Sequence, residues 1–260
     1  MPRSTWLRAL TGTAGEPAGR LVCFPHSGGS ASGFRPWVAH LPDGVRLLAV
    51  QYPGRADRVA EEPVTDVAAI GAAVAAELLA VAPEPELPYT LFGHSLGALA
   101  AYETALALRD AGRPVRRLDV SGCAAPGQVA GGLTHRAPDD ALWSAVAGLG
   151  GLDREVIEDA ELRELLLPAL RADITAHETY RPRPGTAPLD CPVRCFHGAD
   201  DPLVDGAAMA GWAAVTTGGC AVTARPGGHF YRDGTADLTG WVADGPAGVL
   251  PETAGRVRAR

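Results

Sequence analysis

The sequence lacks the long hydrophobic run that a membrane-spanning helix requires. None of the apolar stretches in its 260 residues reaches the roughly 18 residues needed to cross a bilayer. Residues 1–6 also lack the apolar core of a secretory signal peptide. These absences predict a cytoplasmic protein that makes no use of a membrane.

Positive charge is also in short supply. The chain carries 23 Lys and Arg residues against 30 Asp and Glu residues, which gives a formal net charge of −7. A nucleic-acid-binding protein usually presents an excess of basic residues to the phosphate backbone. The charge balance therefore argues against nucleic acid as a partner, and it disfavours general adhesion to anionic membranes.

Cysteine is scarce and scattered, and no internal repeat is visible. An odd number of cysteines without regular spacing predicts free thiols rather than a disulfide framework. Cys191 and Cys195 are close enough to suggest a metal pair, but they lie at the start of a predicted strand with no second pair nearby. We therefore expect no metal site. The five cysteines are Cys23, Cys123, Cys191, Cys195 and Cys220.

The remaining pattern alternates short apolar segments with helical segments, and 47% of the residues are hydrophobic. Apolar strands separated by helices predict a mostly parallel sheet with helices on both faces. The length suits a single α/β domain. We expect helices at 66–81, 96–111 and 207–215, with Thr65 or Asp66 capping the first and Pro83 beyond its end. The expected strands are 21–24, 45–50, 89–92, 117–120, 193–196 and 221–223.

The most informative motif is Gly-His-Ser-Leu-Gly at residues 93–97. It follows an apolar strand and precedes a predicted helix, an arrangement typical of the nucleophile elbow of α/β-hydrolases. Glycine is expected at both ends because a Cβ there would collide with the neighbouring strand or helix. The motif predicts the α/β-hydrolase fold, with Ser95 as the catalytic nucleophile.

A serine nucleophile needs a histidine base and an acid that orients the histidine. In α/β-hydrolases these partners follow in the order serine, acid, histidine. His229 is the last histidine, in a Gly-Gly-His loop after the final predicted strand, and it is the expected base. The loop after strand 193–196 offers Asp200 and Asp201 as acids. The usual Gly-x-x-Asp-x-x-Val spacing, with Gly198 and Val204 at its ends, favours Asp201.

The oxyanion of acyl transfer requires backbone N–H donors. The residue after the nucleophile, Leu96, is one expected donor because it opens a helix. The second donor should come from the Gly-rich loop at residues 25–30, which follows the first predicted strand. Ser27 is the favoured residue there, and Gly28 is the alternative.

Residues 124–188 interrupt the alternation of strands and helices. They contain two helical patterns, at 139–147 and 154–180, and no convincing strand. In a hydrolase such an insertion is usually a helical lid, although an ordinary pair of crossover helices is the alternative. We expect residues 1–123 and 189–243 to form the hydrolase core. The segment 244–260, rich in Pro, Gly, Ala and Arg, is an expected disordered tail.

Taken together, the motifs resemble those of the type II thioesterases, the stand-alone editing enzymes of polyketide and nonribosomal peptide assembly lines. The resemblance covers residues 20–230. Ser27 stands where the family often has alanine and Leu96 where it often has methionine, but only the backbone N–H of each would be used. The similar segments are Phe-Pro-His-Ser-Gly-Gly-Ser at 24–30, Phe34 and Trp37, Val-Gln-Tyr-Pro-Gly-Arg at 50–55, Arg58, and the serine, acid and histidine motifs.

The resemblance implies hydrolysis of acyl groups, often short, from the phosphopantetheine arm of carrier proteins, through an acyl-serine and without a metal or other cofactor. It also implies an acyl-carrier protein as partner, and we expect a monomer. Arg55 or Arg58 is expected in a salt bridge, and Phe34 and Trp37 in the core. A general esterase and a non-catalytic carrier binder are the alternatives. A docking patch or a solvated helix end would explain Arg109, Arg113, Arg116 and Arg117.

Overall fold

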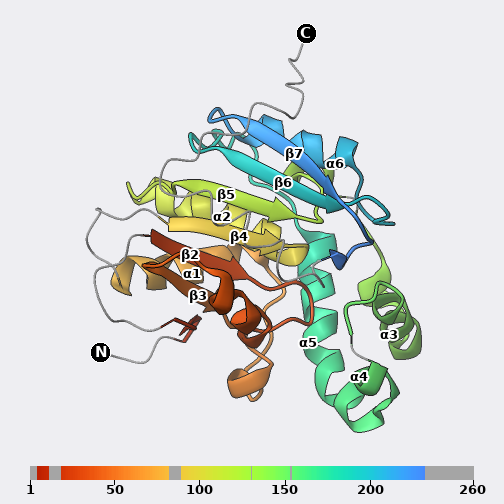
Figure 1. Ribbon diagram of the computed structural model, residues 1–260. Helices are drawn as coiled ribbons and strands as arrows, with labels where there is room; N and C mark the ends of the chain where they lie inside the picture. Colours follow the sequence, from red (N-terminus) through yellow and green to blue (C-terminus); the bar gives the residue numbers. More distant parts are fainter. Residues whose placement is uncertain (1–4, 12–18, 82–88, 130, 153, 232–260) are drawn as a thin grey trace.

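A seven-stranded sheet forms the centre of the computed structural model, which describes residues 5–11, 19–81, 89–129, 131–152 and 154–231. The strand order is β1-β3-β2-β4-β5-β6-β7, and every neighbouring pair from β3 to β7 is parallel. The predicted parallel α/β sheet is therefore confirmed (Figure 1). Its six predicted strands are β2 (Gly19–Phe24), β3 (Val45–Val50), β4 (Tyr89–His94), β5 (Arg117–Ser121), β6 (Val193–Gly198) and β7 (Cys220–Arg225).

One strand was not predicted. Strand β1 (Leu7–Ala9) has three residues and pairs antiparallel with β3 at the edge of the sheet. Glu77 of helix α1 (Val67–Val81) accepts the N–H groups of Trp6 and Leu7 at 2.8 and 3.2 Å. The strand is held by its pairing with β3 and by the Glu77 carboxylate, which lies far away in the sequence. Its own three residues form a pattern too short for the sequence to predict a strand.

Helices α1 (Val67–Val81) and α2 (Leu96–Asp110) pack against each other beside the sheet. The Asp66 carboxylate accepts the Ala68 and Ala69 N–H groups, so Asp66 caps α1. A Cβ added at Gly71 would collide with Glu103 and the backbone of Thr104, so the glycine permits the close approach of α1 to α2. Together the two helices cover one face of the strands with their buried sides.

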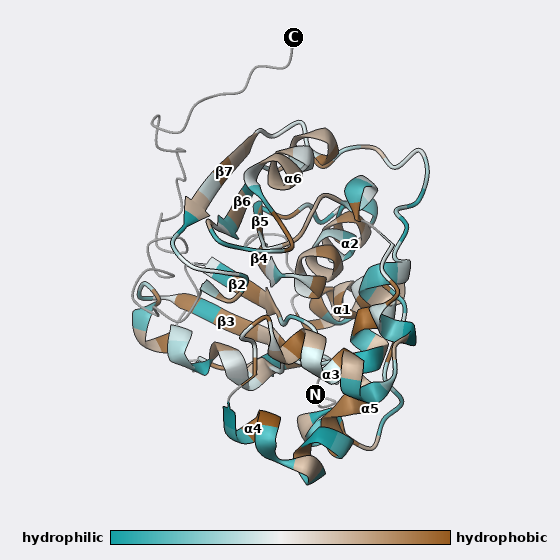
Figure 2. Cartoon of the chain, turned by 90° about the vertical axis from the view of Figure 1, so that its right-hand side faces the viewer, coloured by the Kyte–Doolittle hydropathy of each residue, from teal (hydrophilic) through white to brown (hydrophobic). Residues whose placement is uncertain are grey.

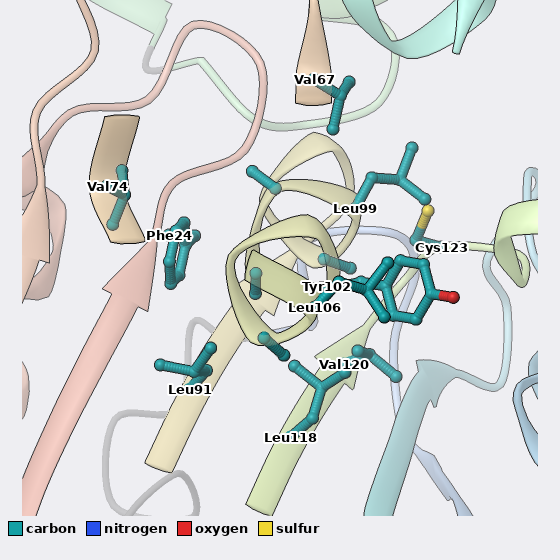
Figure 3. Packing of buried hydrophobic residues seen from close by; sticks show 14 of the residues in the cluster. Phe24, Val67, Val74, Leu91, Leu99, Tyr102, Leu106, Leu118, Val120 and Cys123 are labelled. Carbon is teal, nitrogen blue, oxygen red and sulfur yellow. The ribbon is translucent and has the colours of Figure 1, made fainter. Parts of the chain in front are cut away.

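Both faces are buried in the middle of the sheet, along β2, β4, β5 and β6, as the apolar strands predicted, whereas the edge strand β7 is only partly buried. On β2, Val22 and Phe24 belong to the main core, which α1 and α2 cover, while Leu21 and Cys23 belong to a second cluster. Figure 3 shows strand side chains of the main core meeting those of α2. The second cluster includes Phe34 and Trp37, whose ring centroids lie 5.1 Å apart. The prediction that these two aromatic residues are core is confirmed.

The segment between β5 and β6 is helical, as expected for 139–147 and 154–180. It contains η3 (Pro126–Gln128), η4 (Thr134–Arg136), α3 (Asp139–Ala147), α4 (Arg154–Glu158) and α5 (Ala160–Thr179). The second predicted helix is two helices, because Asp159 adopts an extended conformation and its side chain caps α5. Figure 1 shows α3, α4 and α5 grouped on the side toward which the parallel strands point. We call α3, α4 and α5 the helical insertion.

The structure corrects one further expectation and confirms another. The helix predicted at 207–215 divides into α6 (Gly206–Ala210) and the 3-10 helix η5 (Gly211–Val215). Two further 3-10 helices, η1 (Ala31–His40) and η2 (Ala56–Arg58), follow β2 and β3. All five cysteines are free thiols, as their odd number and scattered spacing predicted. Pro83 and residues 244–260 lie outside the described residues.

No helix within the described ranges is long and apolar enough to span a membrane.

Candidate active site

Ser95 occupies the sharp turn between β4 and α2. Its backbone has φ 54° and ψ −122°, a positive φ that non-glycine residues rarely adopt. The turn is fixed by the Ser95 N–H, which donates to the Ser121 carbonyl at 2.8 Å. A Cβ at Gly93 would collide with the Gly97 carbonyl, and one at Gly97 with the Phe24 carbonyl. The predicted need for both glycines is therefore confirmed, and the strained geometry is that of a nucleophile elbow.

His229 lies on the loop that follows β7, and Asp201 lies on the loop that follows β6. The His229 Nδ1 is 2.8 Å from Asp201 Oδ2, and the two side chains are 2% and 0% exposed. Because a carboxylate only accepts, Nδ1 carries the proton and Nε2 is the acceptor of the neutral ring. The other Asp201 oxygen accepts the Leu203 N–H at 2.9 Å. Asp200 is exposed, so Asp201 is the carboxylate that contacts His229.

The loops carrying this pair are joined to each other. The Asp200 N–H donates to the Gly227 carbonyl at 2.9 Å, and the Ala199 N–H donates to the Arg225 carbonyl at 2.6 Å. Gly198 packs so closely on the Gly227 and Gly228 carbonyls that a Cβ there would collide with them. The position of His229 relative to Asp201 is therefore set by backbone contacts as well as by the side-chain hydrogen bond.

A chain of polar side chains, buried at His94 and partly buried at Tyr231, links the elbow to the segment that carries His229 and was not anticipated from the sequence. The His94 Nδ1 is 2.8 Å from Ser121 Oγ, which is 2.5 Å from the Tyr231 hydroxyl. The His94 and His229 rings pack with centroids 4.8 Å apart. A Cβ at Gly122 would press on both rings, so this glycine, at φ 58°, makes room for them. His94 was visible in the 93–97 motif, but only the fold brings Ser121 and Tyr231 to it.

The Gly-rich loop after β2 forms a turn at the predicted oxyanion position. The Gly29 N–H donates to the His26 carbonyl at 2.9 Å, and Gly28 has φ 79°, as a type II turn requires at its third residue. The Gly28 N–H donates to Asp173 Oδ2 at 2.7 Å. Within the described ranges the Ser27 N–H has no partner. Of the two candidates on this loop, Ser27 is the one available to a ligand.

Leu96, the other expected donor, is the first residue of α2. The first N–H groups of a helix have no partner within the helix, and the helix dipole favours negative charge at this end. The α2 N-terminus contacts the Gly-rich loop directly, because Gly97 lies against the carbonyls of Phe24 and Pro25. The structure thus brings the Ser27 and Leu96 segments together beside Ser95.

Three arginines singled out in the sequence form salt bridges. Arg55 and Arg58 both form salt bridges, with Asp173 and Glu61, which confirms the structural role proposed for residues 50–58. Arg117 is buried in β5 and donates to Asp119. It therefore cannot belong to a docking patch on the surface, because its guanidinium already neutralises a buried carboxylate.

The helical insertion contributes a histidine beside the site. His177 on α5 has its Nε2 3.7 Å from the Cys123 Sγ, just after β5. Burial lowers the pKa of His177 from its ordinary 6.5 to about 4, and burial raises the pKa of Cys123 to about 12. Both groups are therefore neutral at neutral pH. In the part of the chain that is described, no group of three or more His, Cys, Asp or Glu side chains is placed to hold a metal ion.

Comparison with known proteins identifies related chains. The family model "Thioesterase domain" matches residues 19–240. The chain is 42% identical over 231 residues to "Thioesterase PikA5" from Streptomyces venezuelae, an alignment that spans 87% of this chain and 79% of that protein. It is 38% identical to a "Probable cadicidin biosynthesis thioesterase" from Streptomyces griseus, across 87% of this chain and 61% of that protein.

Solved structures show the same architecture. "Structure of the type II thioesterase BorB from the borrelidin biosynthetic cluster" superimposes with a TM-score of 0.84 and 36% sequence identity, covering 94% of this chain and 98% of that one. The predicted α/β-hydrolase fold is confirmed by this similarity.

Proposed function

The chain belongs to the thioesterase family, and we propose that it hydrolyses acyl thioesters held on the phosphopantetheine arm of carrier proteins in polyketide or nonribosomal peptide biosynthesis. The relatives named above are thioesterases, and BorB is a type II thioesterase of a biosynthetic cluster. The observation that carries the proposal is the buried contact between His229 and Asp201, at 2.8 Å, beside the strained Ser95 elbow.

The proposed reaction has two halves that use the same groups. In the first, Ser95 Oγ attacks the thioester carbonyl while His229 Nε2 takes the hydroxyl proton. The carbon–sulfur bond then breaks, and the same proton passes to the departing thiolate of the arm. In the second, a water molecule loses a proton to His229 and attacks the acyl-serine. The serine oxygen leaves with that proton, which releases a carboxylic acid and restores the enzyme.

Asp201 holds His229 in the tautomer that this scheme needs. With Nδ1–H bound to the carboxylate, the Nε2 lone pair is available to Ser95, and the imidazolium that forms is stabilised by the buried negative charge. The oxyanion of each tetrahedral intermediate is assigned to the N–H groups of Ser27 and Leu96. The scheme draws only on side chains, backbone donors and water.

We assign the helical insertion the role of a lid. It connects β5 to β6 and lies on the side toward which the strands point (Figure 1). Ser95 and His229 belong to the same side, because Ser95 directly follows the end of β4 and His229 follows the end of β7. Ligands of parallel α/β sheets bind at the carboxyl ends of the strands. A lid at this place would leave an entry for the arm and limit the length of the acyl group.

The test is hydrolysis of acetyl-, propionyl- and longer acyl-phosphopantetheinyl carrier proteins beside the same acyl groups on small thiols. We expect faster release from the carrier, and loss of turnover by at least about 10⁴-fold in Ser95→Ala. Equal rates on carrier-bound and small thioesters would instead indicate a general esterase. Retained turnover in Ser95→Ala would remove the nucleophile and favour a non-catalytic carrier binder.

A further inference from the structure

We propose that Arg55 and Asp173 are positioning residues, which fix the Gly-rich loop so that the Ser27 N–H, rather than the Gly28 N–H, faces the reacting carbonyl. The inference rests on the proposed function and adds to it a role for one residue of the helical insertion. Asp173 lies on α5, and Arg55 follows β3, so the pair joins the insertion to the core next to the oxyanion loop.

The pair is buried and has the geometry of a strong ion pair. The Arg55 Nη1 and Nη2 atoms lie 2.5 and 2.7 Å from the two Asp173 oxygens, and the side chains are 4% and 2% exposed. Removing two charges from water is costly, and a hydrophobic pair of similar volume often serves stability as well. The presence of a buried ion pair here therefore favours a role other than stability.

The contacts of the pair converge on one loop. Asp173 Oδ2 accepts the Gly28 N–H at 2.7 Å, and Arg55 Nη1 donates to the Gly29 carbonyl at 3.3 Å. The Arg55 guanidinium also lies over the ring of Tyr52. The hydroxyl of Tyr52 donates to the Pro25 carbonyl at 3.1 Å. The backbone on both sides of Ser27 is thus held by side chains that the elbow does not supply.

The consequence for the oxyanion follows from the turn. A carboxylate that accepts the Gly28 N–H occupies that donor and would repel an oxyanion placed there. Because Gly28 is held at positive φ and its N–H points to α5, the preceding Ser27 N–H is left as the donor of this loop. Arg55 neutralises Asp173, so the carboxylate sets the turn without imposing its full negative charge on the nearby intermediate.

The same contacts make the oxyanion site depend on α5. Leu170, one helical turn before Asp173, also packs on the loop, because a Cβ at Gly28 would lie 3.2 Å from its Cδ1. If α5 moves away, the Gly28 N–H loses its acceptor and the turn loses its support. A complete oxyanion site therefore requires α5 to be seated.

The decisive variants are Asp173→Asn and Arg55→Lys, with Glu178→Gln as the matched control. Glu178 is another buried carboxylate of α5, but it accepts from the N–H groups of Thr134 and His135 instead of the Gly-rich loop. Each variant is assayed for kcat and KM on a carrier-bound acetyl thioester. Folding is checked by its Tm, and if Asp173→Asn does not fold, Arg55→Lys decides the question.

Two inhibitors separate positioning from simple loss of structure. Trifluoroacetonyl pantetheine gives an oxyanion when Ser95 adds to its ketone, whereas acetonyl pantetheine is a much weaker electrophile of nearly the same shape. We expect Asp173→Asn and Arg55→Lys to lower kcat by about 10- to 100-fold and to weaken the trifluoro inhibitor by a similar factor. Binding of acetonyl pantetheine, KM and all Glu178→Gln values should stay within about threefold.

Other outcomes overturn the inference. Unchanged kcat in both variants would show that the loop needs no such support. Equal weakening of both inhibitors, or the same losses in Glu178→Gln, would reduce the pair to an anchor of the insertion. The proposed function is tested separately by the wild type and by Ser95→Ala. If the wild type is inactive on thioesters, or Ser95→Ala is active, it is the function itself that fails.

Discussion

The sheet core and the helical insertion are each stabilised in a different way. The core is a continuous hydrophobic cluster in which Leu91, Leu99 and Leu118 are fully buried between the sheet and α2 (Figure 3). The insertion has a small cluster of its own, formed by Leu142, Trp143, Leu170 and Ile174, while Leu165 on α5 is 54% exposed. Figure 2 shows hydrophilic residues along much of α4 and α5.

Ala176 of α5 and Tyr180, which directly follows α5, pack in the main core, and directional polar contacts add to this packing. Asp173 pairs with Arg55, and the Tyr180 hydroxyl donates to the Glu103 carboxylate at 2.5 Å. Hydrophobic burial is non-directional and spread over many side chains, so it tolerates small shifts. A few buried polar contacts instead define one position and are lost together when a helix moves. The core is therefore stabilised by burial spread over many side chains, whereas the position of α5 on it depends on a few specific contacts.

Among the predictions that follow, the largest effect should come from Asp201, the proposed acid, which belongs to the sheet core. We expect Asp201→Asn to lower kcat by roughly 10³- to 10⁴-fold, because an amide in place of the carboxylate favours the wrong tautomer of His229. Asp200→Asn is the matched control, since Asp200 is adjacent but exposed, and it should stay within a few fold. Steady-state kinetics of the two variants decide the matter. The opposite order would transfer the acid role to Asp200.

A second prediction separates the two regions by stability. Leu99→Ala in the main core should lower the free energy of unfolding by about 2–5 kcal/mol and destabilise the whole protein. Leu142→Ala in the small cluster should act locally, raising amide hydrogen exchange in α3 and α5 while leaving β4 and β5 protected. Hydrogen exchange with denaturant unfolding measures both effects. Uniformly faster exchange in both variants would show that core and insertion unfold as one unit.

The smallest effect concerns pH at the boundary between the regions. The folded protein binds a proton on His177 only near pH 4, whereas the unfolded chain binds it near 6.5. Stability should therefore fall as pH drops from about 6.5 to 4, because the unfolded state takes up more protons. His177→Gln should remove part of this dependence, by an amount on the order of 5 °C in Tm between these pH values. If the plots of Tm against pH for His177→Gln and the wild type were parallel, His177 would not be a cause of this pH dependence.

Local patterns were sufficient for the elements that depend on neighbouring residues. The strand before Ser95, the helix after it and the glycines at 93 and 97 follow from hydrophobic periodicity and short-range sterics, and the structure confirms them. A cap at Thr65 or Asp66 was predicted in the same way, and the structure shows that Asp66 makes it. Strand β1 and the break at Asp159 were missed, because three residues on an edge and one cap within a long helical pattern give weak signals.

Contacts between distant segments were not accessible in the same way. A salt bridge was predicted for Arg55 or Arg58, but nothing near them in the chain indicates that Asp173, 118 residues from Arg55, is a partner. Similarly, Ser121 and Tyr231 are ordinary residues in sequence and become neighbours of His94 only when β4, β5 and the loop after β7 come together.

The sequence by itself determined the fold class, the elbow and the order in which serine, acid and histidine occur along the chain. These depend on strand and helix patterns and on residue types that short motifs require. The spacing of residues 198–204 also favoured Asp201, and the structure shows its contact with His229. Only the tertiary structure decided that the Gly28 N–H is taken by Asp173 of α5. This contact depends on the direction of a side chain from a segment far away in the chain, which no local pattern encodes.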